Sequence, residues 1–355
     1  MTKVVWTPDE ATLAHANVTR LMRRHGLESY AELLRRSQEE PEWFWPAVVE
    51  DLGLDFSRPW ERVCDDSRGP EWTTWFTGAT LSIARNCVHR WAERDPARVG
   101  AVFAGEDGTL RELTFGELSR DVTRLAEGLV RLGVEPGDRV AIYLPMSPEV
   151  AVASHACAHV GAVQMPLFSG FAAPAVVQRL RDSEAKVVIT ADYSLRRGAR
   201  LPMRETVEEA VREAPSVEHV VTWERDAGWG AVVDDSPGEL EPLEVDAEHP
   251  YLLTYTSGTT GKPKGVLQAL DDGRRREAGE DRHLDRADVG ARMRCDRDLL
   301  RHRQEDRHPV ALLDAEPHER LREPRHLARE FTVRERPPLA LLALPHRGGS
   351  VGALA

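Results

Sequence analysis

Residues 255–266, YTSGTTGKPKGV, bring together side chains that suit contact with phosphate. Glycine amides can approach phosphate oxygens closely, because no Cβ obstructs them and glycine adopts positive φ freely. Hydroxyl groups add hydrogen-bond donors, and lysine adds positive charge. The candidate phosphate-binding residues are Thr256, Ser257, Gly258, Thr259, Thr260, Gly261, Lys262 and Lys264. We interpret the stretch as a phosphate loop; a shorter stretch of this composition would be an ordinary flexible surface turn.

The spacing of the stretch disfavours one common phosphate loop. A Walker A motif has four residues between its first glycine and a Gly-Lys pair, followed by Ser or Thr. Here only two residues separate Gly258 from Gly261, and Pro263 follows Lys262. A Walker-type nucleotide hydrolase is therefore the weaker interpretation.

Alternating strands and helices precede the loop and would position it. Apolar runs predict buried strands at 137–145, 162–168, 186–190, 219–223 and 251–256. The amphipathic segments between these runs predict helices, so the order favours an α/β fold with a mainly parallel, twisted sheet flanked by helices. The loop leaves the carboxyl end of the last strand, which is the edge where such sheets bind ligands.

Local signals sharpen the start of this α/β region. Two apolar runs around Asp107-Gly108 predict a hairpin within residues 99–115. Thr114 with Glu117 three positions later forms the pattern of a capping box, and Gly133 can end the helix that follows.

The composition divides the chain into three parts. Residues 1–90 are rich in tryptophan and predicted to be a helical N-terminal extension, and residues 91–268 form the α/β part that ends at the phosphate loop. After Gln268 there is no Ile, Lys, Asn, Trp or Tyr, although all nine tryptophans occur before it. With so few large apolar groups, we expect residues 269–355 to be a largely disordered tail.

Charge and cysteine content exclude several classes of protein. The net charge of −12 disfavours nucleic acid or an anionic membrane as partner. The four cysteines form no CxxC pair, and no apolar run reaches the roughly 18 residues of a membrane span. We therefore expect a cytoplasmic protein without a metal site. His155 and His159 have a spacing that could chelate a metal, but their helix is apolar and a core position is favoured.

The loop resembles the signature loop of the AMP-forming adenylating enzymes, which include acyl-CoA synthetases, luciferases and the adenylation domains of peptide synthetases. Several other segments are similar to the acetyl-CoA synthetase branch, including its N-terminal extension: WFWPAVVEDLGLDFSRPW, TGATLSIARNCVHRW, LGVEPGDRVAIYLPMSPE, LFSGFAAPAVVQRL and AKVVITADYSLRRGARLP. The resemblance covers nearly all of residues 25–268 and stops there.

The resemblance implies a site and a reaction. Residues 256–264 would hold the β- and γ-phosphates of Mg²⁺-bound ATP, and a glycine turn with a following arginine would contact CoA. The candidate CoA-binding residues are Gly170, Arg196, Arg197, Gly198 and Arg200. Where the family has a second arginine, this chain has Ala199, and its own Arg200 comes one residue later. The resemblance therefore implies that the contact to the 3′-phosphate is re-aimed. Without the resemblance, these arginines would be interpreted as a solvated basic turn.

The reaction that the resemblance implies joins a short-chain carboxylate to CoA. ATP and the carboxylate would give an acyl-adenylate and pyrophosphate, and the CoA thiol would then displace AMP. After Gln268 we find no counterpart of the family's later segments, so no catalytic residue can be assigned. We expect this chain to be inactive, with an out-of-frame tail; the alternative is a non-catalytic fragment that binds nucleotide, CoA or a partner. The acyl group and the oligomeric state stay open.

Overall fold

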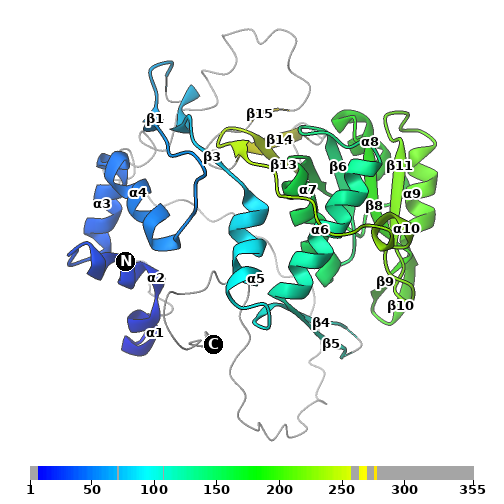
Figure 1. Ribbon diagram of the computed structural model, residues 1–355, viewed down its shortest axis with the longest axis horizontal. Coiled ribbons are helices and arrows are strands. Elements are labelled where there is room, and N and C mark those ends of the chain that lie inside the picture. Colours follow the sequence, from blue (N-terminus) through cyan, green and yellow to red (C-terminus); the bar gives the residue numbers. More distant parts are fainter. Residues whose placement is uncertain (1–6, 70–71, 107, 257–263, 270–275, 278–355) are drawn as a thin grey trace, which may run out of the picture. The chain divides into compact units, whose positions relative to one another are not determined.

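A mixed sheet forms the framework of the α/β part. Among the described residues, seven strands pair in the order β11-β8-β6-β7-β13-β14-β15 (Figure 1). The strands are β6 (Arg139–Tyr143), β7 (Val163–Pro166), β8 (Val187–Ala191), β11 (His219–Trp223), β13 (Pro250–Thr256), β14 (Lys264–Ala269) and β15 (Arg276–Glu277). The strands from β11 to β13 are parallel, whereas β14 and β15 are antiparallel. The prediction of a mainly parallel sheet is confirmed.

The computed structural model describes residues 7–69, 72–106, 108–256, 264–269 and 276–277. The predicted loop residues 257–263 lie outside the described residues, as do residues 270–275 and 278–355 of the predicted tail. The described tail residues, 269 and 276–277, lie in strands β14 and β15.

Helices cover both faces of the sheet. They are α5 (Arg90–Arg94), α6 (Phe115–Arg131), α7 (Pro148–Val160), α8 (Ala173–Ser183), α9 (Met203–Val211) and the short α10 (Ala231–Asp234). The chain moves one way along the sheet from β6 to β7 and the other way from β7 to β8 and β11. Since such crossovers are right-handed, α7 lies on one face and α8 and α9 on the other. Leu125, Leu129 and Leu180 from these helices are fully buried in the core.

The predicted signals are confirmed at both ends of α6, which ends at Arg131, just before Gly133 with its positive φ of 78°. Thr114 and Glu117 form a reciprocal capping box at the start of α6. Gly161 follows the last residue of α7 and adopts a left-handed conformation with φ of 73°. Residues with a Cβ rarely adopt this conformation, so glycine is the usual residue at the end of a helix. Short-range signals of this kind therefore set the start of α6 and the end of α7.

Two hairpins project beyond the sheet. The predicted hairpin pairs β4 (Val99–Ala104) with β5 (Leu110–Thr114). A second hairpin, which the sequence analysis did not predict, pairs β9 (Tyr193–Arg196) with β10 (Ala199–Pro202). Its turn places Arg197 and Gly198 at φ values of 52° and 76°, the positive values that a two-residue hairpin of this type requires.

The N-terminal extension is only partly helical, which corrects the prediction for residues 1–90. Its helices are α1 (Glu10–His15), α2 (Asn17–Arg24), α3 (Tyr30–Glu39) and α4 (Pro41–Leu52). Three strands follow: β1 (Arg62–Asp65), β2 (Thr74–Thr77) and β3 (Thr80–Leu81), then a π-helical turn, η2 (Arg85–His89). The β2 segment is TWFT, and such β-branched and aromatic residues favour strands. Strand β3 pairs with β12 (Val245–Asp246), which lies just before β13.

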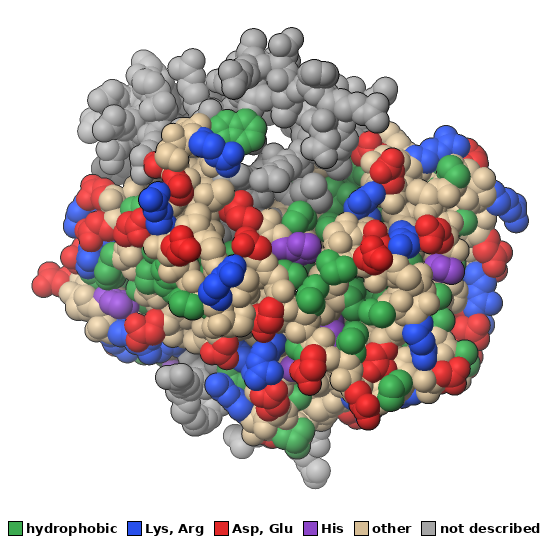
Figure 2. Space-filling view, turned by 45° about the horizontal axis from the view of Figure 1, so that its top comes forward, with side chains coloured by type: hydrophobic (Ala, Val, Ile, Leu, Met, Phe, Trp, Pro, Cys, Tyr) green, Lys and Arg blue, Asp and Glu red, His purple; other side chains and the backbone are tan. Residues whose placement is uncertain are grey.

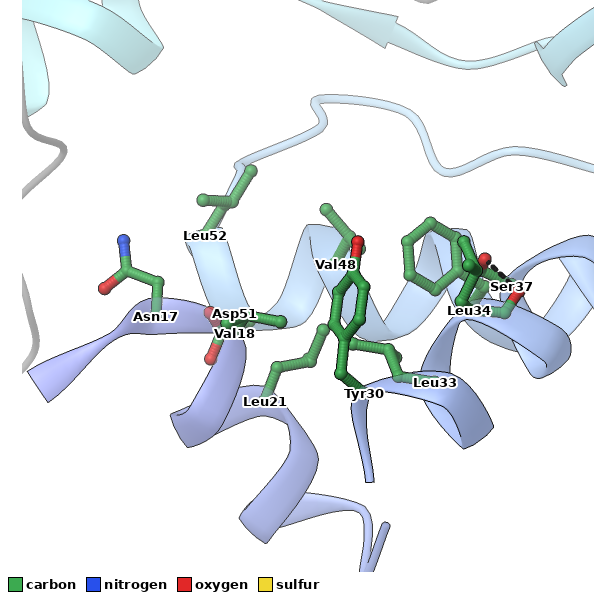
Figure 3. Close-up of a pocket in the computed structure, with 11 residues that line it drawn as sticks. Asn17, Val18, Leu21, Tyr30, Leu33, Leu34, Ser37, Val48, Asp51 and Leu52 are labelled. Atoms are coloured by element: carbon green, nitrogen blue, oxygen red, sulfur yellow. Dashed lines mark hydrogen bonds between the residues drawn. The ribbon is translucent and has the colours of Figure 1, made fainter. Parts of the chain in front are cut away.

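A pocket of about 330 Å³ lies among α2, α3 and α4, and we call it the helical pocket (Figure 3). Its lining is mainly apolar, with Leu21, Leu33 and Val48 among the residues that point into it. Tyr30 and Leu34 at its margin are 62% and 45% exposed, so this apolar surface is open to solvent.

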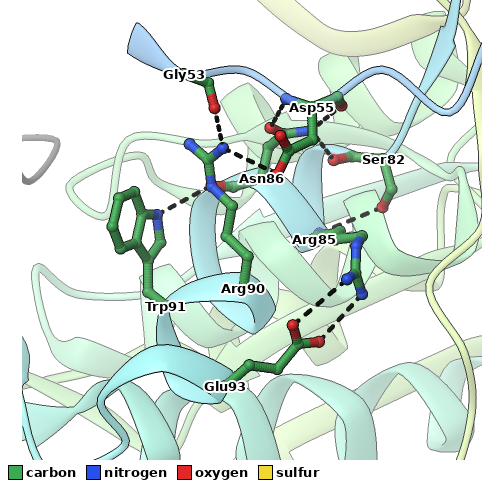
Figure 4. Close-up of polar contacts among 8 residues, drawn as sticks. All are labelled: Gly53, Asp55, Ser82, Arg85, Asn86, Arg90, Trp91 and Glu93. Carbon is green, nitrogen blue, oxygen red and sulfur yellow. Dashed lines mark hydrogen bonds and ion pairs between the residues drawn. The ribbon is translucent and has the colours of Figure 1, made fainter. Parts of the chain in front are cut away.

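A polar network joins the segment after α4 to η2 and to the start of α5 (Figure 4). The Asn86 amide accepts a hydrogen bond from the Asp55 backbone N–H at 2.9 Å and donates one to the Asp55 carbonyl at 2.9 Å. The Arg90 guanidinium is almost fully buried and donates to the Gly53 carbonyl and to the Asp55 carboxylate. Residues 53–55 are therefore held by side chains from η2 and α5.

Acidic and basic side chains are interspersed over the surface in Figure 2, so no one sign of charge dominates this face of the described part. Across the described ranges, no helix combines the length and the apolar character that crossing a bilayer demands.

Candidate functional site

A second pocket, of about 320 Å³, lies beside the carboxyl ends of the parallel strands. Its walls come from both hairpins, from the chain after β6, from the turn after β7 and from the residue that follows β11 by two positions. We call it the arginine pocket, because Arg111, Arg196 and Arg225 line it. Ligands of open α/β sheets bind at this edge, so its position fits a binding site.

Gly170 forms part of the wall, and a side chain added there would have to displace its neighbours. A Cβ added there would lie 2.5 Å from Cε1 of Phe168 and 3.2 Å from Nη1 of Arg196. The turn itself is held by the Tyr143 hydroxyl, which donates its one proton to the Phe171 carbonyl at 2.7 Å and lies 3.2 Å from the Ser169 carbonyl. The glycine therefore lets a rigid backbone approach both an aromatic ring and a guanidinium.

The structure brings two of the five predicted CoA-binding residues together. Gly170 and Arg196 line the same pocket, and Arg196 is exposed. Arg197 donates its backbone N–H to Oε2 of Glu106 at 2.6 Å, which stabilises its left-handed conformation. Arg200 lies over the ring of Tyr193 at 4.4 Å, and neither it nor Arg197 nor Gly198 is among the lining residues.

Two arginines of the pocket were not predicted. Arg225 comes two positions after β11, and a residue just beyond a parallel strand could have been chosen from the sequence on that ground. Arg111 lies on the first hairpin, where no sequence signal marks it. Its guanidinium forms an ion pair with Glu149 at 2.8 Å, and the Glu149 side chain is only 7% exposed.

Strands β13 and β14 carry the two ends of the predicted phosphate loop. Thr256 and Lys264 are register partners of this antiparallel pair, so the backbone is paired on both sides of the loop. The Tyr255 hydroxyl donates to Oδ2 of Asp182 at 2.7 Å, and burial raises the pKa of this tyrosine. The Arg179 guanidinium lies 4.1 Å from the ring of Phe171 and 5.5 Å from that of Tyr255. One α8 side chain therefore touches both the glycine turn and the strand that leads to the loop.

A buried histidine pair joins η2 to the C-terminal part of α7. His159 Nε2 must donate to the Leu240 carbonyl at 2.9 Å, because a carbonyl only accepts. His159 Nδ1 then accepts from His89 Nε2 at 3.0 Å, and His89 Nδ1 accepts from the Ser119 hydroxyl at 2.8 Å. Burial lowers the pKa of His89 to about 4, with smaller contributions from His159, His155 and Arg85.

His155 and His159 lie on one helix but bond to different groups, and His159 is bonded to Leu240 and His89. His155 Nδ1 bonds instead to the Ala151 carbonyl at 2.7 Å. Over the described residues, no three or more His, Cys, Asp or Glu side chains are grouped so as to hold a metal ion.

Comparison with known proteins identifies the family. Residues 88–270 match the model of the AMP-binding enzymes, and residues 30–87 match that of the acetyl-coenzyme A synthetase N-terminus. The chain therefore belongs to the AMP-binding enzyme family, and it resembles acetyl-coenzyme A synthetases through both segments.

Individual relatives show the extent of the match. The acetyl-coenzyme A synthetase of Thiobacillus denitrificans is 37% identical over 274 residues, which is 74% of this chain and 41% of the relative. That of Streptomyces coelicolor is 40% identical over 274 residues, 74% of this chain and 40% of the relative. The solved acetoacetyl-CoA synthetase from Streptomyces lividans has a TM-score of 0.68 and 34% identity, covering 75% of this chain and 43% of that one. The chain thus spans about two fifths of the length of these relatives.

Proposed function

We propose that this chain carries the CoA-nucleotide-binding part of an AMP-forming acyl-CoA synthetase. The reaction of such an enzyme is ATP plus a short-chain carboxylate plus CoA to acyl-CoA, AMP and pyrophosphate, through an acyl-adenylate. The observation that carries the proposal is the arginine pocket, where Gly170 and Arg196 meet at the ligand-binding edge of the sheet.

The chemistry of the pocket suits a nucleotide. Guanidinium groups bind phosphate through paired N–H donors, and aromatic faces stack on nucleobases. Phe168 is 59% exposed, and both its ring and the Arg196 guanidinium lie next to Gly170. An aromatic ring and a positive charge are therefore available side by side to a nucleotide. The pocket volume of about 320 Å³ falls at the lower end of ordinary ligand sites, roughly 300–1,000 Å³.

For ATP, the support is the sequence of residues 256–264 together with the pairing of Thr256 with Lys264. We assign the triphosphate to this loop, where glycine amides, hydroxyls and Lys262 and Lys264 would contact it. The donor set contains no carboxylate, so Mg²⁺ would arrive bound to the phosphates of ATP and would offset their negative charge.

The proposal has a direct test in two measurements. Calorimetric titration of CoA into the purified chain should show binding that the substitution Gly170→Val abolishes, because the new side chain would fill the space next to Phe168 and Arg196. The proposal is contradicted if the Gly170→Val chain binds CoA as tightly as the wild type does, or if the wild type does not bind CoA.

Exchange of radioactive pyrophosphate into ATP tests the catalytic half. We propose that the chain does not complete adenylation, because the residues after Gln268 have no counterpart of the family's later segments. Exchange should stay at background with acetate, propionate and butyrate. Carboxylate-dependent exchange would show instead that the chain is an active ligase.

A further inference from the structure

Arg225 has features of a binding residue that the predicted CoA-binding set did not include. It lines the same pocket as Gly170 and Arg196, but it comes from the segment after β11 rather than from the β9–β10 hairpin. Arg225 and Arg196 therefore reach the pocket from different elements of the chain.

Aromatic rings on two strands hold the Arg225 guanidinium in place. Its central carbon lies 5.0 Å from the ring of Tyr193 and 5.4 Å from that of Trp223. Its Nε donates to the Tyr193 carbonyl at 3.4 Å, and its backbone N–H donates to Oδ2 of Asp192 at 3.3 Å. Stacking leaves the terminal N–H groups of a guanidinium available, and an arginine held in this way loses little freedom when a ligand binds.

Within the described part of the chain, the Arg225 guanidinium forms no ion pair with a carboxylate. Arg111, which shares the pocket, is paired with Glu149 at 2.8 Å, and nearby Arg204 is paired with Glu224. Among the described residues, Arg196 and Arg225 are the two lining arginines without an ion pair to a carboxylate. The acidic lining residue, Glu106, already accepts the backbone N–H of Arg197.

Two unpaired guanidinium groups from different elements fit a ligand with two anionic groups. We propose that Arg225 is a second phosphate-binding residue of the arginine pocket, which makes the pocket select a nucleotide phosphorylated at two positions, such as an adenosine 3′,5′-bisphosphate group. This inference rests on the proposed function, because it assumes that a nucleotide occupies the pocket. It adds a residue that determines which nucleotide is preferred.

The test compares three ligands on four proteins by calorimetry at low ionic strength. The ligands are adenosine 3′,5′-bisphosphate, adenosine 5′-monophosphate and adenosine. The proteins are the wild type, Arg225→Gln, Arg196→Gln and the control Arg212→Gln, which changes an exposed arginine outside the lining. The wild type should prefer the bisphosphate to the monophosphate by roughly tenfold or more, the value expected for one charge-assisted phosphate contact.

Each arginine should account for a different phosphate. Two preferences can be measured: that for the bisphosphate over the monophosphate, and that for the monophosphate over adenosine. Arg225→Gln should remove most of one of these preferences, and Arg196→Gln should remove most of the other one. Arg212→Gln should change neither. A variant that keeps positive charge, Arg225→Lys, should restore part of the lost preference, and a melting curve for each variant checks that it is folded.

The outcomes separate the inference from the function on which it rests. If the wild type binds none of the three ligands, the proposed function fails and the inference falls with it. If the wild type binds the bisphosphate but Arg225→Gln binds it equally well, only the inference is wrong. Equal weakening of all three ligands by Arg225→Gln would also overturn it, because that pattern indicates a purely structural residue.

Discussion

The helical pocket and the arginine pocket have nearly the same volume, about 330 and 320 Å³, but offer different chemistry. The first is lined by side chains of three helices and is mainly apolar, with Leu21, Leu33 and Val48 among its residues. The second is lined by hairpins and strand ends and carries three arginines. The comparison shows that the volume of a pocket does not indicate its ligand, whereas the secondary-structure elements that line it do.

The physical reason lies in the elements. Packed amphipathic helices turn their apolar stripes toward one another, so a gap between them is lined by the same side chains as their core. Strand ends and hairpins expose backbone and polar side chains, and parallel strands bring several such ends to one edge. We therefore expect changes in the helical pocket to act on stability and changes in the arginine pocket to act on ligand binding.

The largest expected effect is on the helical pocket. Leu33→Ala removes a side chain that is 5% exposed and should lower the free energy of unfolding by roughly 3 kcal/mol, from lost burial and the cavity left behind. Urea unfolding, with hydrogen exchange of residues 30–52, measures the loss. The matched control Leu34→Ala, at a position 45% exposed, should cost well under about 1 kcal/mol. A tenfold loss of nucleotide binding in Leu33→Ala would show that the two regions are not independent.

Acid should destabilise the α/β part through the histidine pair. The folded pKa of His89 is about 4, below its ordinary value of 6.5, so the neutral form is favoured in the fold. The stability that this contributes is complete above about pH 6.5 and is lost as the pH falls toward 4, on the order of 2 kcal/mol after discounting for partial solvent contact.

Hydrogen exchange at pH 7 and pH 4.5 would measure this loss in η2 and α7. His89→Gln should reduce the acid sensitivity, because the amide can still bond to its neighbours without gaining charge. The control His15→Gln, at an exposed position in the extension, should leave it unchanged. Equal acid sensitivity of His89→Gln and the wild type would contradict the assignment.

A smaller effect is expected at the glycine turn. Gly170→Ala places a methyl group 2.5 Å from a Phe168 ring carbon, so the ring or Arg196 must shift. We expect roughly tenfold weaker binding of adenosine 3′,5′-bisphosphate, about 1.4 kcal/mol, with little change in the melting temperature. In the extension, Gly26→Ala meets no atom within 4 Å and changes only backbone strain at a φ of 65°. It should lower stability and leave the affinity unchanged, the reverse of Gly170→Ala.

The smallest effect should be a gain. Glu106→Gln removes a negative charge from the lining of the arginine pocket but keeps an oxygen that can accept the Arg197 N–H. Affinity for the bisphosphate should rise about two- to threefold, or roughly 0.5 kcal/mol, because the removed charge is exposed and well screened. Glu112→Gln, on the same hairpin but outside the lining, is the control. A loss of affinity would mean that Glu106 acts mainly by holding the turn.

Much of the fold could be predicted because its signals are local. The capping box at Thr114 and the left-handed Gly133 are set by a few neighbouring residues, and the buried strands are continuous apolar runs. The β9–β10 hairpin was missed because its strands are short and its turn uses Arg197 where Asn is the usual residue. Its conformation depends on Glu106, which is distant in sequence.

The site was predicted in part for the same reason. Gly170 and Arg196 were found through short motifs, but the roles of Arg111 and Arg225 depend on contacts that only the folded chain makes. Likewise, the spacing of His155 and His159 on one helix was visible, whereas the partner that His159 takes, His89, comes from another segment. The roles of these residues depend on contacts between segments that are far apart in the sequence, and local sequence patterns do not predict such contacts.

The pairing of β3 with β12 has a consequence for the synthesis of the chain. Strand β3 ends at Leu81 and its partner begins at Val245, so the ribosome makes most of the α/β part between them. At roughly 5–20 residues per second, this interval is about 10–30 seconds. The helices of the extension rest on local contacts and can form early, but β3 must stay unpaired for that time, exposed to proteases and chaperones.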